Sequence, residues 1–148
     1  MQARKSDLHR WLMLAGTLPF LLGAVLLVLG ISPAFLAVDS ALLVKSYTLA
    51  IISFMAGVHW GQSFAQVERP NLLRVLSNVF CLTPWFLLIT GVSNAAFFAG
   101  SAIVFITLLA VDYRLEKAEA ISSDYLRART AVTAIVCGSL VVSAIGSS

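Results

Sequence analysis

Long apolar runs separated by short polar segments dominate the pattern along this chain. Each run is nearly free of charge and is long enough for a helix, rising about 1.5 Å per residue, to cross about 30 Å of hydrocarbon. The pattern therefore predicts an all-α fold, a polytopic bundle of five transmembrane helices. The expected spans are Trp11 to Ile31, Tyr47 to Phe64, Val75 to Gly91, Ala95 to Val111 and Thr130 to Gly146.

Composition supports this interpretation and limits the domain count. The chain has 148 residues, of which 59% are hydrophobic and only 11% are charged, whereas soluble domains are roughly 25% charged. Its mean hydropathy is +0.93. Residues 1–148 are expected to form a single membrane domain, because the length leaves no room for a separate soluble catalytic or nucleic-acid-binding domain.

The distribution of basic residues predicts the orientation of the bundle. If the loops alternate between the two sides of the membrane, Lys45 stands alone on one side. The other nine lie together on the opposite side, which the positive-inside rule identifies as the cytoplasm. We expect a cytoplasmic N-terminus and an external C-terminus. The nine residues are Arg4, Lys5, Arg10, Arg69, Arg74, Arg114, Lys117, Arg127 and Arg129.

Two sets of small residues are candidates for close helix packing. In the first span glycines recur every seven positions around Pro19, and in the second span small residues recur every four positions. Such stripes allow neighbouring transmembrane helices to approach closely. The sets are Gly16, Gly23 and Gly30, and Ser53, Gly57 and Gly61.

His59 is the most conspicuous polar residue within a span, and Gln62, Ser63 and Gln66 follow it on the same helical face. An unpaired imidazole in hydrocarbon is costly, so His59 is expected to face the bundle interior or a wet cavity. Three interpretations remain open. The ring could fix helix register through an interhelical hydrogen bond, serve a binding or proton-transfer site, or lie at lipid headgroup level.

Shared depth predicts the partners of His59. Several polar residues at the cytoplasmic ends of the spans could form one pocket open to the cytoplasm, although Trp60 and Arg127 also suit anchoring at the membrane interface. The candidate pocket comprises His59, Trp60, Gln62, Asn78, Asp112, Tyr113, Arg127 and Thr130.

Other chemistry is sparse. The two cysteines, Cys81 and Cys137, are interpreted as packing residues, and no cluster of His, Cys, Asp or Glu has the spacing of metal ligands. The sequence predicts neither a metal nor a cofactor. Before the last span, Ser123 is a candidate N-cap for a helix that begins near Asp124.

Several short motifs resemble an uncharacterised bacterial multi-pass membrane family shared with the mitochondrial transmembrane-protein-69-like proteins. The similarity covers roughly residues 8–143 and is most specific in the second span. It implies a multi-pass protein of the bacterial cell (inner) membrane and leaves the activity open. The motifs are Pro19-Phe20, Gly57-Val58-His59-Trp60-Gly61, Pro84-Trp85, Asp112, and Tyr125-Leu126-Arg127 followed by Thr130 and Thr133.

Three classes of function follow, ranked by their support. The first is a non-enzymatic assembly or partner subunit of a membrane complex, whose partners are the lipid bilayer and another membrane protein or a second copy of the chain. The second is a binder or carrier of a small molecule or lipid, for example a quinone, at the pocket around His59. A membrane enzyme ranks last, because no nucleophile with its base and no paired carboxylates can be assembled.

Overall fold

The computed structural model describes residues 3–33, 38–65 and 67–147, and all regular secondary structure in these ranges is helical. Five candidate membrane spans are present within the described residues, as the sequence predicts. Two short helices form the first of them. The helices are α1 (Ala3–Ala15), α2 (Leu18–Val28), α3 (Ser40–Gln62), α4 (Pro70–Ile89), α5 (Asn94–Lys117) and α6 (Ser123–Gly146).

The first span is broken, because Pro19 interrupts the backbone ladder. Proline has no N–H to donate to the carbonyl four residues earlier, and its ring crowds that carbonyl. The carbonyl in question belongs to Ala15, where α1 ends. The chain turns through Gly16 and Thr17 before α2 begins, and the hydroxyl of Tyr47 donates to the Gly16 carbonyl at 3.0 Å. The first predicted span is therefore present, and two helices form it.

Side-chain caps mark the starts of α3 and α6. The second span begins at Ser40 rather than Tyr47, because the Asp39 carboxylate accepts a hydrogen bond from the Leu42 N–H at 2.7 Å. The last helix begins at Ser123, in agreement with the start predicted near Asp124. Its N-cap is Ser122, whose hydroxyl accepts from the backbone N–H of Tyr125 at 3.3 Å, so the cap lies one residue earlier than expected.

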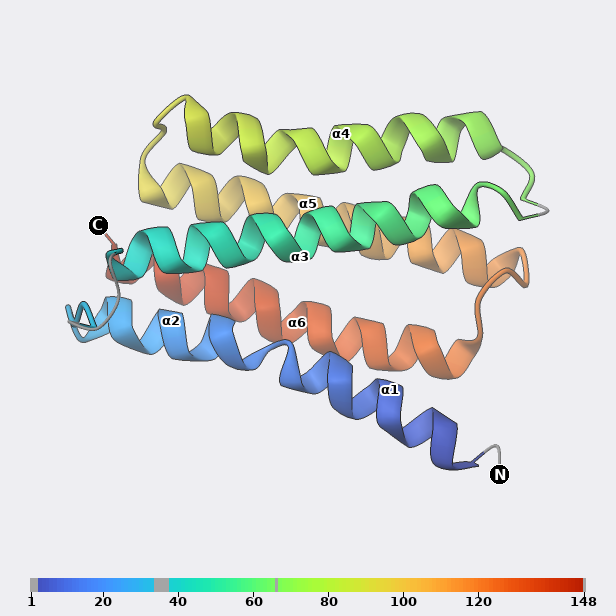
Figure 1. The fold of residues 1–148 in the computed structure, drawn as a ribbon, viewed down its shortest axis with the longest axis horizontal. Helices are drawn as coiled ribbons and strands as arrows, with labels where there is room; N and C mark the ends of the chain where they lie inside the picture. Colours follow the sequence, from blue (N-terminus) through green and yellow to red (C-terminus); the bar gives the residue numbers. More distant parts are fainter. Residues whose placement is uncertain (1–2, 34–37, 66, 148) are drawn as a thin grey trace.

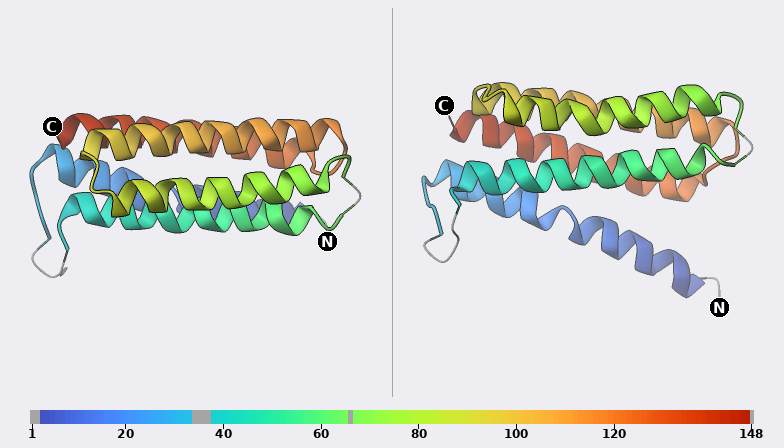
Figure 2. Two further views of the ribbon diagram at one scale, coloured as in Figure 1. Left: turned by 90° about the horizontal axis from the view of Figure 1, so that it is seen from above. Right: turned by 45° about the horizontal axis from the view of Figure 1, so that its top comes forward.

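The helices run alternately up and down in a compact bundle (Figure 1). Seen from above, α5 and α6 lie in one layer and α3 and α4 in the other (Figure 2). Helix α2 packs against α3 and α6. Helix α1 diverges from the bundle, and its main contact is with α6 (Figure 2). The N-terminal end, the α3–α4 connection and the α5–α6 connection share one end of the bundle. This end carries nine of the ten basic residues, and its cytoplasmic location remains a prediction.

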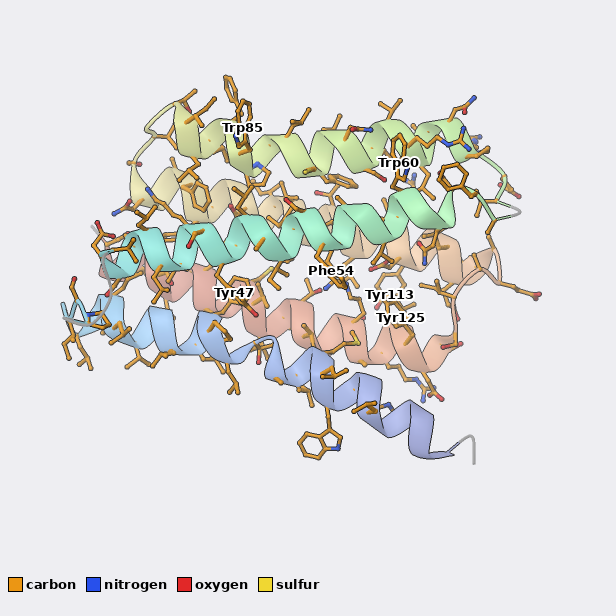
Figure 3. The ribbon with its side chains drawn as sticks, viewed as in Figure 1. Tyr47, Phe54, Trp60, Trp85, Tyr113 and Tyr125 are labelled. Carbon is orange, nitrogen blue, oxygen red and sulfur yellow. The ribbon has the colours of Figure 1, made fainter. Side chains whose placement is uncertain are left out.

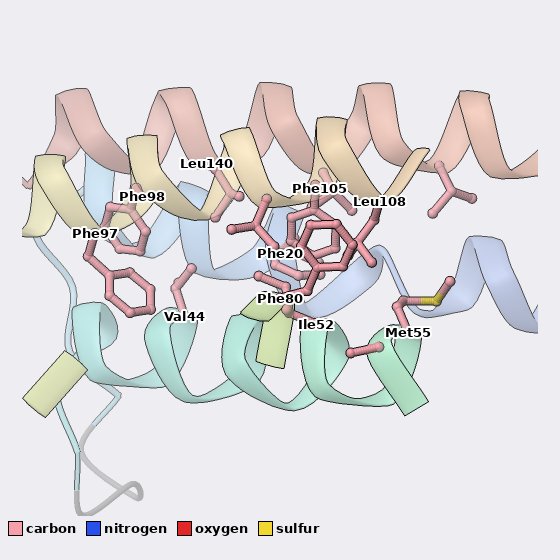
Figure 4. Close-up of a cluster of buried hydrophobic side chains, with 14 residues drawn as sticks. Phe20, Val44, Ile52, Met55, Phe80, Phe97, Phe98, Phe105, Leu108 and Leu140 are labelled. Carbon is pink, nitrogen blue, oxygen red and sulfur yellow. The ribbon is translucent and has the colours of Figure 1, made fainter. Parts of the chain in front are cut away.

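Aromatic and branched side chains fill the centre of the bundle (Figure 4). The ring of Phe20 from α2 meets Phe105 from α5 edge to face, with 5.9 Å between the ring centroids, and Tyr47 from α3 at 5.0 Å. Large apolar side chains also cover the outside: Trp11 and Ile145 are both 71% exposed. A chain apolar both inside and outside is the pattern of a bundle surrounded by lipid.

The predicted packing residues separate into two groups. A Cβ on Gly23 would collide with the side chain of Val44 in α3, so this glycine is a true close-approach position. Ser53 accepts a hydrogen bond from the thiol of Cys81 in α4, with 3.4 Å between sulfur and oxygen. In contrast, a Cβ atom added to Gly57 or Gly61 would have no heavy atom of another described segment within 4 Å. These two glycines therefore face away from the other described helices.

The first-span glycines that flank Gly23 have other roles. Gly30 has a φ of +64° in the turn that ends α2, which favours glycine, and nothing lies within 4 Å of its Cβ position. Gly16 lies in the break between α1 and α2, and its Cβ position is 3.9 Å from the hydroxyl oxygen of Tyr47.

The Gly23→Ala substitution is expected to destabilise the bundle by about 1 to 3 kcal/mol, because the new methyl group overpacks against a stiff, buried β-branched side chain. The matched control is Gly57→Ala, which adds the same methyl group in open space and is expected to be neutral or stabilising by up to about 1 kcal/mol. Unfolding free energies measured in detergent check both changes. Equal stabilities of the two variants would contradict the close contact between α2 and α3.

Candidate functional site

Three charged or titratable side chains meet inside the bundle, where α3, α5 and α6 lie side by side. The carboxylate of Asp112 in α5 accepts hydrogen bonds on both oxygens. His59 Nε2 from α3 lies 2.7 Å from Oδ1, and Arg129 Nε from α6 donates to Oδ2 at 3.1 Å. All three side chains are at most 3% exposed. We call this group the buried triad.

Helical periodicity explains why these polar residues face inward. His59 follows Ile52 and Ala56 on the buried face of α3, at intervals of seven and three residues. Asp112 continues the buried stripe of α5 four residues after Leu108, and Arg129 precedes the buried Val136 by seven residues. Each member of the buried triad thus lies on the same helix face as apolar residues that are buried in the core, and it is buried together with them.

The triad lies close to the end of the bundle that carries most of the basic residues. At about 1.5 Å per residue, its members are about 5 to 9 Å along the axis from the ends of α3 and α5 and the start of α6. Asp112 and Arg129 balance each other in charge. A neutral His59 that donates from Nε2 keeps the triad neutral overall, which limits the cost of burying it.

Two hydrogen-bonding atoms of the triad have no partner among the described residues: His59 Nδ1 and Arg129 Nη2. The Oε1 atom of Gln62, one helical turn after His59, is also buried and unpartnered. Such atoms are costly in a medium of low polarity unless a water molecule or a ligand satisfies them. They indicate where a polar group could bind.

The structure joins only some residues of the predicted pocket. His59 and Asp112 meet directly, and Gln62 lies near them. Tyr113 and Thr130 share a hydrogen bond of 3.1 Å with each other on the exposed side. The remaining three residues also lie outside the buried triad. Asn78 and Arg127 are exposed, and the Asn78 amide donates to the Arg74 carbonyl at 2.9 Å. Trp60 is 41% exposed and packs edge to face on Phe64. Gln66, expected on the same stripe, lies outside the described residues.

Sequence reasoning omitted Arg129 from the candidate pocket in favour of Arg127. The two side chains differ by two positions, or about 200° around the helix, so only one of them can face inward. The signal was available in the spacing from Arg129 to Val132, Thr133 and Val136, which all lie on the buried face of α6.

An apolar cavity of about 750 Å³ adjoins the buried triad. Arg129 and Gln62 form part of its wall, and most of its other lining residues are apolar side chains from α1, α2, α3, α5 and α6. Figure 3 shows two of the lining residues, Phe54 and Tyr125, in the space between α3 and α6. A volume of this size suits a small organic molecule.

The break in the first span shapes this cavity. Leu12 and Gly16 line one side, where α1 diverges from the bundle axis (Figure 2). Leu12 and Phe54, both in the wall, are 64% and 67% exposed. The cavity therefore opens laterally, toward the surroundings that a bilayer would fill, and its polar groups lie at its inner side.

The imidazole of His59 contacts the carboxylate of Asp112 through Nε2. The hydrogen-bond partner of His59 is thus a carboxylate, and no hydroxyl or thiol is hydrogen-bonded to its ring in the described residues. The same residues contain no group of three His, Cys, Asp or Glu side chains that could hold a metal ion. The parts needed to activate a nucleophile are not assembled at this site.

The fold is that of a multi-pass helical membrane protein with a buried ionic triad. Residues 6–145 match the family model described as a protein of unknown function (DUF3429), and the chain belongs to this family. No curated protein and no solved structure matches the chain significantly.

Removing the carboxylate with Asp112→Ala is expected to cost about 3 to 5 kcal/mol of stability, because Arg129 would remain buried without its counter-charge. The control Asp124→Ala removes an exposed carboxylate, 3.5 Å from Arg10, and is expected to cost at most about 1 kcal/mol. Unfolding free energies in detergent measure both. The double variant Asp112→Leu with Arg129→Met should recover much of the loss, since it removes both charges. Equal costs for the two alanine variants would refute a stabilising role of the buried pair.

Proposed function

We propose that this protein is a non-enzymatic binder of an amphipathic small molecule in the bacterial inner membrane. The carrying observation is the laterally open apolar cavity whose wall includes Arg129 and Gln62, each with a buried polar atom that has no partner. The apolar tail of the ligand would occupy the space near Phe54 and Leu12. Its polar head would reach Arg129.

The unpartnered atoms limit the chemistry of the ligand head. Arg129 Nη2 carries only donor hydrogens, so it requires an acceptor such as a carbonyl, hydroxyl or acidic oxygen. The Gln62 amide can present either its oxygen or its nitrogen, so it can accept from a hydroxyl through the oxygen or donate to a carbonyl through the nitrogen. An isoprenoid quinone or a lipid with a small oxygen-rich head meets these requirements. The ion pair with Asp112 holds Arg129 in position before the ligand arrives.

Two expectations from the sequence, the membrane location and the family resemblance, fit the same proposal. The basic end of the bundle suits the cytoplasmic face of a bacterial inner membrane under the positive-inside rule. The resemblance to mitochondrial transmembrane-protein-69-like proteins fits a protein that works in an energy-converting membrane. Quinones and similar carriers dissolve in such membranes.

Filling the cavity provides a direct test that leaves the buried triad intact. Val58→Phe places a ring in the cavity wall, and Val79→Phe adds the same ring on the exposed surface of α4. Native mass spectrometry of the full chain, with a short-tailed benzoquinone as probe, should show binding that is weakened at least about tenfold by Val58→Phe and unchanged by Val79→Phe. Gln62→Leu should weaken binding by about five- to tenfold through loss of one hydrogen bond. Equal binding by all variants would overturn the proposal.

A second candidate function is a partner subunit of a membrane complex. It is favoured by the outward position of Gly57 and Gly61, which lie one helical turn apart on α3 with open space over both. Small residues that no helix of this chain covers would allow a helix of another protein, or of a second copy, to approach the α3 backbone.

The Gly57→Leu substitution separates these two functions. No heavy atom of another described segment lies within 4 Å of the Cβ position at Gly57, so folding and binding of the benzoquinone probe should be unchanged. A partner docked on this face would be lost from the gently extracted complex, whereas Val58→Phe would retain it. Recovery of the same partner with Gly57→Leu would exclude docking at this stripe.

A further inference from the structure

A second hollow, distinct from the cavity beside the buried triad, lies between the start of α4 and the end of α5. It has a volume of about 360 Å³ and an apolar floor that includes Leu72, Leu76 and Val111. Its lining also contains Arg69, Arg114, Lys117 and one acidic residue, Glu68. We call it the basic groove. It shares no lining residue with the larger cavity.

The charges of the basic groove favour an anion. The lining of the hollow holds three cationic side chains and a single carboxylate, and within the described part of the chain none of the four forms an ion pair with another. Arg69 and Arg114 are both exposed. Cations left without counter-ions at the rim of a hollow attract an anionic group from the surroundings.

The first turn of α4 adds to this attraction. Arg69 is the N-cap residue and provides no side-chain cap, and a proline at the start of the helix removes one N–H. The remaining first-turn N–H groups carry the partial positive charge of a helix N-terminus. The C-terminal end of α5, which also borders the groove, carries the partial negative charge of a helix C-terminus. Arg114 and Lys117 lie in this last turn and offset that negative charge.

Depth and shape select the kind of anion. The start of α4 and the end of α5 lie at the end of the bundle that carries most of the basic residues (Figure 1). The basic side chains of the groove are therefore at headgroup level, whereas Leu76 and Val111 lie further along the two spans. A free inorganic anion would use the rim and leave the apolar floor uncovered. A phospholipid would use both, with its phosphate at the rim and an acyl chain against Leu72, Leu76 and Val111.

We propose that the basic groove is a binding site for one anionic phospholipid. The headgroup phosphate lies between Arg69, Arg114 and Lys117, and the acyl chain follows the apolar floor. Glu68 opposes the anion and tunes the affinity. This site acts independently of the cavity beside the buried triad and stands whether or not that cavity binds a ligand.

A matched pair of double variants tests the site. Arg69→Gln with Arg114→Gln removes two charges from the groove, and Arg10→Gln with Arg127→Gln removes two exposed charges at the same end of the bundle. The full chain is reconstituted with phosphatidylglycerol and phosphatidylcholine of identical acyl chains, and native mass spectrometry counts the lipid retained. Thermal unfolding verifies that both double variants remain folded.

The wild-type chain should retain one phosphatidylglycerol in preference to phosphatidylcholine. The groove variant should lose about 25-fold in this preference, since each basic residue near an anionic headgroup contributes about fivefold. The control variant should keep it. The single variant Glu68→Gln should increase the retention, because it removes the opposing charge. Equal losses in the two double variants, or no loss in either, would overturn the proposal.

Discussion

The interaction on which this structure most depends is the buried contact of Asp112 with His59 and Arg129. Water is absent from the hydrocarbon region, so each ion or polar group there must find its partner within the protein. Asp112 meets this requirement by using both carboxylate oxygens, one toward α3 and one toward α6. The contact sets the rotation and depth of three helices that apolar packing alone would leave free to slide. Helices in lipid have no strong hydrophobic drive to associate, which gives such a contact more influence over register.

The break at Pro19 has the opposite effect on the bundle. By ending α1 at Ala15, it releases the N-terminal segment from the packing of α2 and leaves space beside α3 and α6. The rigid triad and the diverging helix thus occupy opposite sides of one cavity. This combination gives a fixed polar group within reach of a lateral opening, which is the geometry that a lipid-soluble ligand needs.

The cavity beside Arg129 and the basic groove differ in polarity and in depth within the bundle. The cavity beside Arg129 is largely apolar and reaches into the bundle, whereas the basic groove at Arg69 and Arg114 lies at the surface of its charged end. The first suits a molecule that dissolves in the bilayer, and the second suits a headgroup that belongs to it. The linings of both include cationic side chains near the same end of the bundle.

The sequence alone determined the all-helical class and the five spans, and it favoured an inward position for His59, because hydrophobic length and helical period are local properties. It also identified Asp112 as a partner at similar depth. Only the tertiary structure decided that Arg129 pairs with Asp112, that Asn78 lies apart from this pair, and that Gly57 faces outward while Gly23 meets Val44. Depth follows from counting residues along a span, but lateral position depends on how each helix is rotated and which helix lies beside it. Those two quantities arise from packing between segments far apart in the chain, and no local pattern encodes them.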